Sequence, residues 1–316
     1  MISSLFPGQG SQSIGMGNLF YQNFKESKNV FDEVDDALGE KLSSLIFEGN
    51  IKDLTRTSNA QPALMAVSMA IVKVIEKETG EKLSNITPIM AGHSLGEYTA
   101  ACALGVMGIS DTAKLLRLRG DEMQKSAPEG VGSMAAVIGL PISVIEKICS
   151  EISLSEKKYC GIANDNSPDQ VVITGYKESV ELAIDNCNEA GAKRVVKLPV
   201  SAPFHSPLMK NAADKVEERL SQIVVSEPSG ILMSNYTAKA SKNANDIKSL
   251  LVKQITGRVR FRELVHSIYN ENVRKFIEIG PGRVLSTLVK RTESDVLTLC
   301  INQPSDIEKA IKFIKE

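Results

Sequence analysis

The chain has 316 residues, of which 42% are hydrophobic, and its formal net charge is −1. A chain of this length can bury a large core, and its near-neutral charge gives no electrostatic reason to expect nucleic acid or an anionic membrane as a main partner. The five cysteines are scattered and lack C-x-x-C spacing, which argues against a disulfide framework and a structural zinc site. We therefore expect a globular cytoplasmic protein that holds no metal.

The N-terminal segment carries no signal for export or membrane insertion. It has no basic stretch that leads into an apolar run, and no apolar run in the chain approaches the roughly 18 residues of a membrane span. We expect a protein without a membrane-spanning helix.

The first predicted elements lie in residues 1–125. Apolar residues at helical spacing between 64 and 75 predict a helix that ends before Gly80, and the run at 88–91 predicts a short strand. Two more helices follow this strand, and Ser110 is the expected N-cap of the second one.

Ser94 lies in a G-x-S-x-G pentapeptide between the short strand and the next helix, residues 95–105. A sharp strand-to-helix turn projects a serine hydroxyl out of the sheet and leaves backbone N–H groups nearby to hold developing negative charge. Gly92 and Gly96 permit the crowding at such a turn. The pentapeptide alone fits a nucleophile and an ordinary turn about equally well.

Residues 126–199 have a different pattern, which predicts a small inserted subdomain. Two helices each follow one strand and precede another, and turn residues separate the two middle strands. The order βαββαβ is that of a ferredoxin-like unit. The expected strands are 132–140, 159–165, 170–175 and 193–200, with helices after Pro141 and around 180–187 and a turn at 166–169.

The remaining residues return to the first pattern. Short apolar strands at 230–235, 275–280 and 296–302 alternate with helices, which indicates a mainly parallel sheet covered on both faces. The sequence therefore predicts an α/β protein whose large domain is discontinuous, at 1–125 and 200–316.

A serine nucleophile usually needs a histidine, and the chain has three. His93 adjoins Ser94, so its side chain should point away from the hydroxyl. His266 falls off the apolar face of its helix and should be a solvated surface residue. His205 is held between two prolines in a loop, where a rigid side chain can enter a cleft, and it is the candidate base by elimination. No aspartate stands out as a third member, which leaves a Ser–His dyad oriented by backbone carbonyls.

Arg119 lies in the middle of an apolar helix stripe, whereas Arg117 points to the opposite side. A buried guanidinium stays charged, so it needs a carboxylate or a phosphate as partner. The residues alone leave two choices open: an internal Asp or Glu, or the carboxylate of a substrate.

The glycine-rich segment 6–17 follows the first apolar residues. Ser13 occupies the third position of G-x-G-x-x-G, and no GK[ST] follows, so both nucleotide-binding motifs are weak matches. One interpretation is a tight turn after an edge strand. The other is a loop whose Gln9 N–H forms an oxyanion hole together with the N–H of Leu95.

These segments together resemble the malonyl-CoA:acyl carrier protein transacylase family, over nearly the whole chain. The motifs appear in the family's order and approximate spacing, and so many ordered motifs make a specific signal. They are FPGQGSQ, GHSLGEY, RLRG with Arg119, NSPDQVVITG, PVSAPFHSPLM with His205, LVKQI with Gln254, and FIEIGPG.

The resemblance implies an α/β-hydrolase-like core with the ferredoxin-like insertion, and it assigns roles. Ser94 would carry malonyl as an ester, with His205 as base and then acid, and Arg119 would pair with the free malonyl carboxylate. Gln9 and Leu95 would supply the oxyanion donors. Gln254 would position His205 through its backbone and line the pocket, and Phe204 would suit a malonyl-sized pocket.

The implied partners are malonyl-CoA as a substrate and acyl carrier protein as the acceptor, with no cofactor. We expect a monomer, and we expect the acidic carrier protein to dock near basic residues at the subdomain edge, Lys193, Arg194 and Lys197. Two alternatives remain: a serine hydrolase such as a thioesterase, and a non-enzymatic module that binds acyl groups or carrier protein. A hydrolase of neutral acyl chains has no use for Arg119 in its pocket, and intact Ser94 and His205 argue against the binding module.

Overall fold

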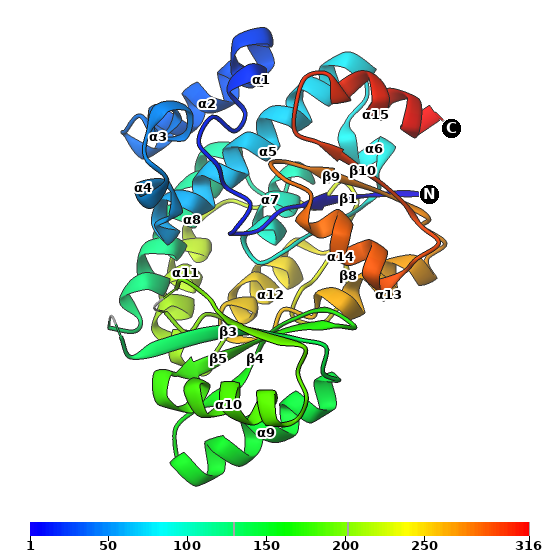
Figure 1. Ribbon diagram of the computed structural model, residues 1–316. Coiled ribbons are helices and arrows are strands. Elements are labelled where there is room, and N and C mark those ends of the chain that lie inside the picture. Colours follow the sequence, from blue (N-terminus) through cyan, green and yellow to red (C-terminus); the bar gives the residue numbers. More distant parts are fainter. Residues whose placement is uncertain (129, 201, 316) are drawn as a thin grey trace.

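The computed structural model describes residues 1–128, 130–200 and 202–315. It contains a six-stranded sheet and a separate four-stranded sheet, and helices pack around both (Figure 1). This arrangement confirms the predicted fold class, an α/β core with a mainly parallel sheet and an inserted ferredoxin-like unit.

The six-stranded sheet forms the centre of the core. Its order is β10-β9-β1-β2-β7-β8, with parallel pairs except for the antiparallel edge pair β7 and β8. The strand β1 therefore lies inside the sheet, and the interpretation of residues 6–17 as a turn after an edge strand is wrong. The strands are β1 (Ile2–Phe6), β2 (Ile89–Gly92), β7 (Ile231–Met233), β8 (Ala240–Ser241), β9 (Lys275–Ile279) and β10 (Leu297–Ile301).

Helices cover both faces of this sheet because successive strand residues point to opposite sides. Phe6 packs with the cluster that includes α5, α7 and α8, whereas its neighbour Leu5 packs with α13 and α14. The core helices are α1 (Asn18–Asn23), α2 (Lys25–Leu38), α3 (Leu42–Glu48), α4 (Ile51–Thr55), α5 (Thr57–Thr79), α6 (Leu83–Ile86), α7 (Leu95–Ala103), α8 (Ile109–Lys125), α11 (Lys210–Gln222), α12 (Ala244–Thr256), α13 (Phe261–Asn270), α14 (Val284–Thr292) and α15 (Asp306–Lys315), with a 3₁₀ turn at Pro207–Met209.

Two details of these helices differ from the sequence predictions. Ser110 is not an N-cap, because α8 begins at Ile109 and its N-cap is Gly108; the Ser110 hydroxyl instead donates to the Glu33 carboxylate at 2.8 Å. Helix α5 has 23 residues and is apolar enough to span a membrane by length and composition, a length of apolar helix that the sequence analysis did not identify. However, 83% of its most apolar window is buried inside the fold, as in the core helix of a globular domain.

The second sheet has the order β4-β5-β3-β6 and is antiparallel throughout, as in a ferredoxin-like unit. One face packs on α9 and α10 and the other faces the core (Figure 1). The predicted turn at 166–169 is shorter in the structure, because β4 continues through Ser167. The elements are β3 (Gly132–Ile138), α9 (Ile142–Glu156), β4 (Cys160–Ser167), β5 (Gln170–Tyr176), α10 (Lys177–Glu189) and β6 (Arg194–Lys197). The predicted boundaries at 126 and 199 stay a prediction.

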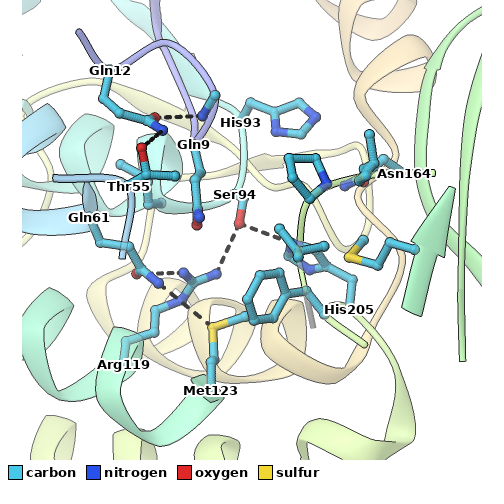
Figure 2. A pocket seen from close by; sticks show the side chains of 17 residues that line it. Gln9, Gln12, Thr55, Gln61, His93, Ser94, Arg119, Met123, Asn164 and His205 are labelled. Atoms are coloured by element: carbon cyan, nitrogen blue, oxygen red, sulfur yellow. Dashed lines mark hydrogen bonds between the residues drawn. The ribbon is translucent and has the colours of Figure 1, made fainter. Parts of the chain in front are cut away.

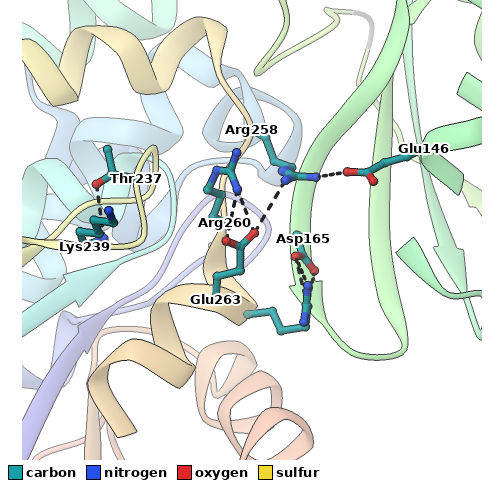
Figure 3. A network of polar contacts seen from close by, with 8 residues as sticks. Glu146, Asp165, Thr237, Lys239, Arg258, Arg260 and Glu263 are labelled. Carbon is teal, nitrogen blue, oxygen red and sulfur yellow. Dashed lines mark hydrogen bonds and ion pairs between the residues drawn. The ribbon is translucent and has the colours of Figure 1, made fainter. Parts of the chain in front are cut away.

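A polar junction joins this unit to the core between α12 and α13. Val259 donates to the Ala163 carbonyl at 2.8 Å and accepts from Asp165 N–H at 2.9 Å, so the segment before α13 adds a short parallel bridge to β4. Arg262 also grips the fully buried Asp165 carboxylate with Nε and Nη2, each at 2.9 Å. Nearby, Arg258 reaches Glu146 on α9 at 2.6 Å (Figure 3).

Candidate active site

Ser94 lies at a sharp elbow between the end of β2 and the start of α7. Its backbone has φ 54° and ψ −109°, a strained conformation for a residue with a Cβ. The elbow also requires its glycines: a Cβ on Gly92 would lie 2.0 Å from the Gly96 carbonyl, and a Cβ on Gly96 would lie 2.1 Å from the Phe6 carbonyl oxygen. The local geometry is therefore that of the predicted nucleophile elbow.

His205 meets the Ser94 hydroxyl, as the elimination among the three histidines predicts. Its Nε2 lies 2.9 Å from Ser94 Oγ (Figure 2). Its Nδ1 lies 2.9 Å from the Gln254 carbonyl oxygen. A carbonyl only accepts, so Nδ1 carries the proton and Nε2 is free to accept one from the serine. Burial, followed by the positive charge of Arg119, lowers the pKa of His205 to about 3. The imidazole is thus held neutral and ready to act as a base.

The other two histidines are placed as the sequence predicts. The His93 ring turns away from the hydroxyl, and its Nε2 donates to Asn166 Oδ1 at 2.8 Å. His266 is a surface residue that contacts the Glu293 carboxylate at 2.7 Å. Neither side chain competes with His205 for the serine proton.

Arg119 is buried directly beside the nucleophile, with 1% of its surface exposed. Its Nη2 donates to Ser94 Oγ at 3.0 Å and to Gln254 Oε1 at 2.9 Å, and its Nη1 donates to Gln61 Oε1 at 2.6 Å. Among the residues that the structure describes, no carboxylate lies within ion-pair distance of this guanidinium. Arg117 points away, as predicted, and pairs with Glu40.

Among the described residues, neutral oxygens and the Tyr98 ring, 5.0 Å from the guanidinium carbon, therefore hold the Arg119 cation. The internal ion pair, one of the two choices the sequence left open, is not formed there. Burial lowers the pKa of Arg119, but a guanidinium stays charged at neutral pH. A buried cation without a carboxylate is costly, so this site is suited to receive an external anion.

Gln9 and Leu95, the two predicted oxyanion donors, line the same cavity as Ser94. Within the described ranges, neither Gln9 N nor Leu95 N donates a hydrogen bond, and both residues line the cavity. Leu95 is the first residue of α7, where an N–H has no partner within the helix. Two free donors beside a serine can stabilise an oxyanion.

Gln254 contacts His205, Arg119 and Ser94. Its carbonyl orients His205, as predicted, and its side chain contacts both Arg119 and the Ser94 carbonyl, the latter at 2.8 Å. It is fully buried and is not among the residues that line the cavity, so its predicted role as a lining residue is not supported.

The cavity has a volume of about 240 Å³ and a predominantly apolar lining around its few polar groups. Phe204 contributes to the lining, and its fit to a malonyl-sized pocket stays a prediction; Ser201 of the same motif lies outside the described residues. In the described part of the chain, no group of three or more His, Cys, Asp or Glu side chains is placed to hold a metal ion. The lining residues are Gln9, Gly10, Gln12, Thr55, Gln61, His93, Ser94, Leu95, Arg119, Met123, Met134, Asn164, Leu198, Pro199, Val200, Phe204 and His205.

Sequence reasoning missed three polar residues of this site. Gln61 holds Arg119, Asn235 accepts from Ser94 N–H at 2.8 Å, and Glu97 accepts from the Gln254 side chain at 2.7 Å. Gln61 lies on a helix and Asn235 after a short strand, and neither stands in a motif for such a role. Only Glu97, within the GHSLGEY motif, carried a signal that pointed to this site.

The family model of the acyl transferase domain matches residues 4–309, so the chain belongs to this family of acyltransferases. The malonyl CoA-acyl carrier protein transacylase of Bacillus subtilis (strain 168) is 43% identical over 316 residues, which cover 100% of this chain and 98% of that protein. The protein of the same name from Escherichia coli (strain K12) is 39% identical, with 98% of each chain covered.

Solved structures agree with these relatives. The acyl-carrier-protein S-malonyltransferase from Bartonella henselae superposes with a TM-score of 0.96 at 45% identity, covering 100% of this chain and 99% of that one. A malonyl-transacylase in complex with a type II PKS acyl-carrier protein superposes with a TM-score of 0.94 at 39% identity, with 99% of each chain covered.

Proposed function

We propose that this enzyme moves a malonyl group from malonyl-CoA to the phosphopantetheine thiol of acyl carrier protein, through an ester on Ser94. The observation that carries the proposal is the Arg119 guanidinium, which lies 3.0 Å from Ser94 Oγ and has only neutral partners among the described residues. A malonyl group has a free carboxylate one methylene beyond its reacting carbonyl, so it can pair with this cation while its thioester meets the serine.

In the first half-reaction, His205 Nε2 takes the Ser94 proton as Oγ attacks the thioester carbonyl. The carbonyl oxygen becomes negatively charged, and the N–H groups of Gln9 and Leu95 stabilise it. The carbon–sulfur bond then breaks, and His205 gives its proton to the departing coenzyme A thiolate. The malonyl group remains on Ser94 as an ester.

In the second half-reaction, His205 takes the proton of the phosphopantetheine thiol while the sulfur attacks the ester carbonyl. The carbon–oxygen bond breaks, and Ser94 Oγ recovers its proton from His205. A thioester is consumed and a thioester is formed, so the overall reaction is nearly isoenergetic and the enzyme only lowers barriers.

A serine hydrolase or thioesterase would use the same serine and histidine with water as the acceptor. The buried Arg119 cation favours the transferase, because a hydrolase of neutral acyl chains would bury this charge without a partner. The relatives named above are transacylases and do not favour the hydrolase.

The test is to incubate the protein with malonyl-CoA and to measure its intact mass and its peptides. The wild-type chain should gain one malonyl group on Ser94 and lose it when carrier protein is added. The Ser94→Ala variant should gain none. A folded wild-type chain that is never malonylated would overturn the proposal.

The finer partner and location assignments belong to the same proposal. We infer a cytoplasmic monomer that needs no cofactor and binds neither nucleic acid nor membrane.

Lys193 and Arg194 are exposed at the subdomain edge and suit an acidic carrier protein, whereas Lys197 is already paired with Glu181 at 2.9 Å. If the carrier docks there, its KM should rise with salt, and more so in the wild type than in Lys193→Gln/Arg194→Gln. An equal salt dependence of the two proteins would place the docking surface elsewhere.

A further inference from the structure

Glu97 is a buried carboxylate that the proposed reaction does not use. It lies in the first turn of α7, three residues after the nucleophile, and none of its surface is exposed. Burial raises the pKa of Glu97 to about 7. Burying a carboxyl group costs free energy unless hydrogen bonds offset the loss of water.

One carboxylate oxygen connects this side chain to the site. Oε2 accepts from Gln254 Nε2 at 2.7 Å and from the backbone N–H of Asn235 at 3.1 Å. The Ser234 side chain lies close enough to lower the pKa of the carboxyl, although Oε1 itself has no hydrogen-bond partner among the described residues. The link to Gln254 and Asn235 therefore runs through the one acceptor atom that these two donors share.

The first donor, the Gln254 amide, can in principle turn either way round. An acceptor at Glu97 requires its NH₂ on that side, and the same NH₂ also donates to the Ser94 carbonyl at 2.8 Å. Its Oε1 is then left facing Arg119, where it accepts from Nη2 at 2.9 Å. The reversed amide would set NH₂ against the guanidinium and oxygen against the acceptors, so these three hydrogen bonds and the longer one from Nε2 to Asn235 Oδ1, at 3.5 Å, would be lost.

The second donor connects Glu97 to the elbow. Asn235 Oδ1 accepts from Ser94 N–H at 2.8 Å, and its Nδ2 donates to the Gly92 carbonyl at 2.7 Å. By holding the Asn235 backbone, Glu97 supports the side chain that ties down both ends of the strained turn.

Arg119 depends on such indirect support, since no carboxylate among the described residues is close enough to fix its direction. Its hydrogen-bond partners are the two glutamine amides and the Ser94 hydroxyl, and the Tyr98 ring lies 5.0 Å from its guanidinium carbon. Its Nε has no hydrogen-bond partner among the described residues. We propose that Glu97 is a positioning residue that fixes the orientation of the Gln254 amide and thereby aims the Arg119 guanidinium at the carboxylate of the substrate. This inference rests on the proposed malonyl transfer.

The experiment compares malonyl-CoA with acetyl-CoA, which lacks the second carboxylate. Glu97→Met removes the acceptor at similar length. It should lower the malonyl-to-acetyl ratio of kcat/KM by roughly tenfold or more, the loss typical of one hydrogen bond to a charged group. A general loss of structure would lower both rates and leave this ratio unchanged, so an unchanged ratio in a folded Glu97→Met variant overturns the proposal.

Glu97→Gln is the matched control. Its amide oxygen can accept the same two bonds at the position of Oε2, and its NH₂ takes the place of the oxygen that has no partner. The ratio should stay within about threefold of the wild type, because orientation rather than charge is what Glu97 supplies. A ratio that falls as far as in Glu97→Met would overturn the proposal.

Gln254→Met gives a second test in case Glu97→Met does not fold. It removes the side-chain amide and keeps the backbone carbonyl that orients His205. The ratio should fall as it does in Glu97→Met, and the double variant should lose no more than either single variant. An unchanged ratio in Gln254→Met, or additive losses in the double variant, would refute the route through this amide. Malonylation of wild-type Ser94, measured first, separates failure of this inference from failure of the proposed function.

Discussion

The two sides of the cavity are built in different ways. The polar wall (Gln9, Gln61, Ser94, Arg119 and His205) comes from the core, and most of its side chains are fixed by hydrogen bonds to one another or to Gln254. The apolar wall (Met134, Leu198, Pro199, Val200 and Phe204) comes from the ferredoxin-like unit and from the segment that leaves it.

The polar wall therefore carries the reacting groups, and the apolar wall encloses them. The groups that we assign to proton transfer and charge stabilisation keep fixed mutual positions, as electrostatic preorganisation requires. The apolar wall makes few polar contacts, and it excludes water from the serine ester only while the small unit stays in place. The polar junction at Asp165 then matters for function, because it holds that unit on the core.

Removing the cation from the polar wall should have the largest effect. Arg119→Met should lower malonyl transfer about a hundredfold or more, because the substrate carboxylate would be buried without its partner. Acetyl transfer should fall much less. The measurement is kcat/KM with both substrates, and Arg117→Met, on the opposite face of α8, is the matched control. Equal losses for the two substrates would mean that Arg119 is only structural.

Weakening the junction should have an intermediate effect. Arg262→Met leaves the fully buried Asp165 carboxylate without its ion pair, and Arg262 itself is one-third exposed. We expect the free energy of unfolding to fall by about 2 kcal/mol, less than the cost for a fully buried pair. Urea denaturation measures this loss.

The control for that variant is Arg258→Met. Its partner Glu146 is 50% exposed, so the loss should be below about 1 kcal/mol. Equal losses in the two variants would show that burial of Asp165 does not decide the strength of the junction.

The smallest expected effect is that of pH on the polar wall. His205 must be neutral to accept the serine proton, and burial and Arg119 lower its pKa to about 3. The ordinary loss of rate as pH falls through the usual histidine range should therefore be missing. We expect kcat/KM for malonyl-pantetheine, which lacks titrating phosphates, to change less than about twofold between pH 7 and pH 5. A sigmoidal loss centred near pH 6.5 would contradict this environment for His205.

Much of the polar wall could be predicted from the sequence because its signals are local. The G-x-S-x-G spacing placed Ser94 at an elbow, the helical position of Arg119 marked a buried cation, and only three histidines had to be compared for His205. The residues that hold these groups in place could not be predicted in this way, because their partners lie far away in the sequence. Asn235 contacts a residue 141 positions away, and Gln61 contacts one 58 positions away. No local pattern encodes a partner at that distance.

The same limit explains the errors about the first strand and the helix cap. A serine near a helix start is a good cap by propensity, but Ser110 instead bonds Glu33, 77 residues earlier in the chain. The position of β1 in its sheet likewise depends on β9, whose residues come near the other end of the sequence.

The position of β1 also sets the order of events during synthesis. This strand is translated long before one of its two neighbours, Lys275–Ile279. The sheet that carries the serine elbow therefore cannot be completed until residues 275–279 have been made, and closing so long a loop is slow. The β3–β6 unit needs only local contacts and can form earlier, so a nascent chain carries a folded small unit beside an unfinished catalytic sheet.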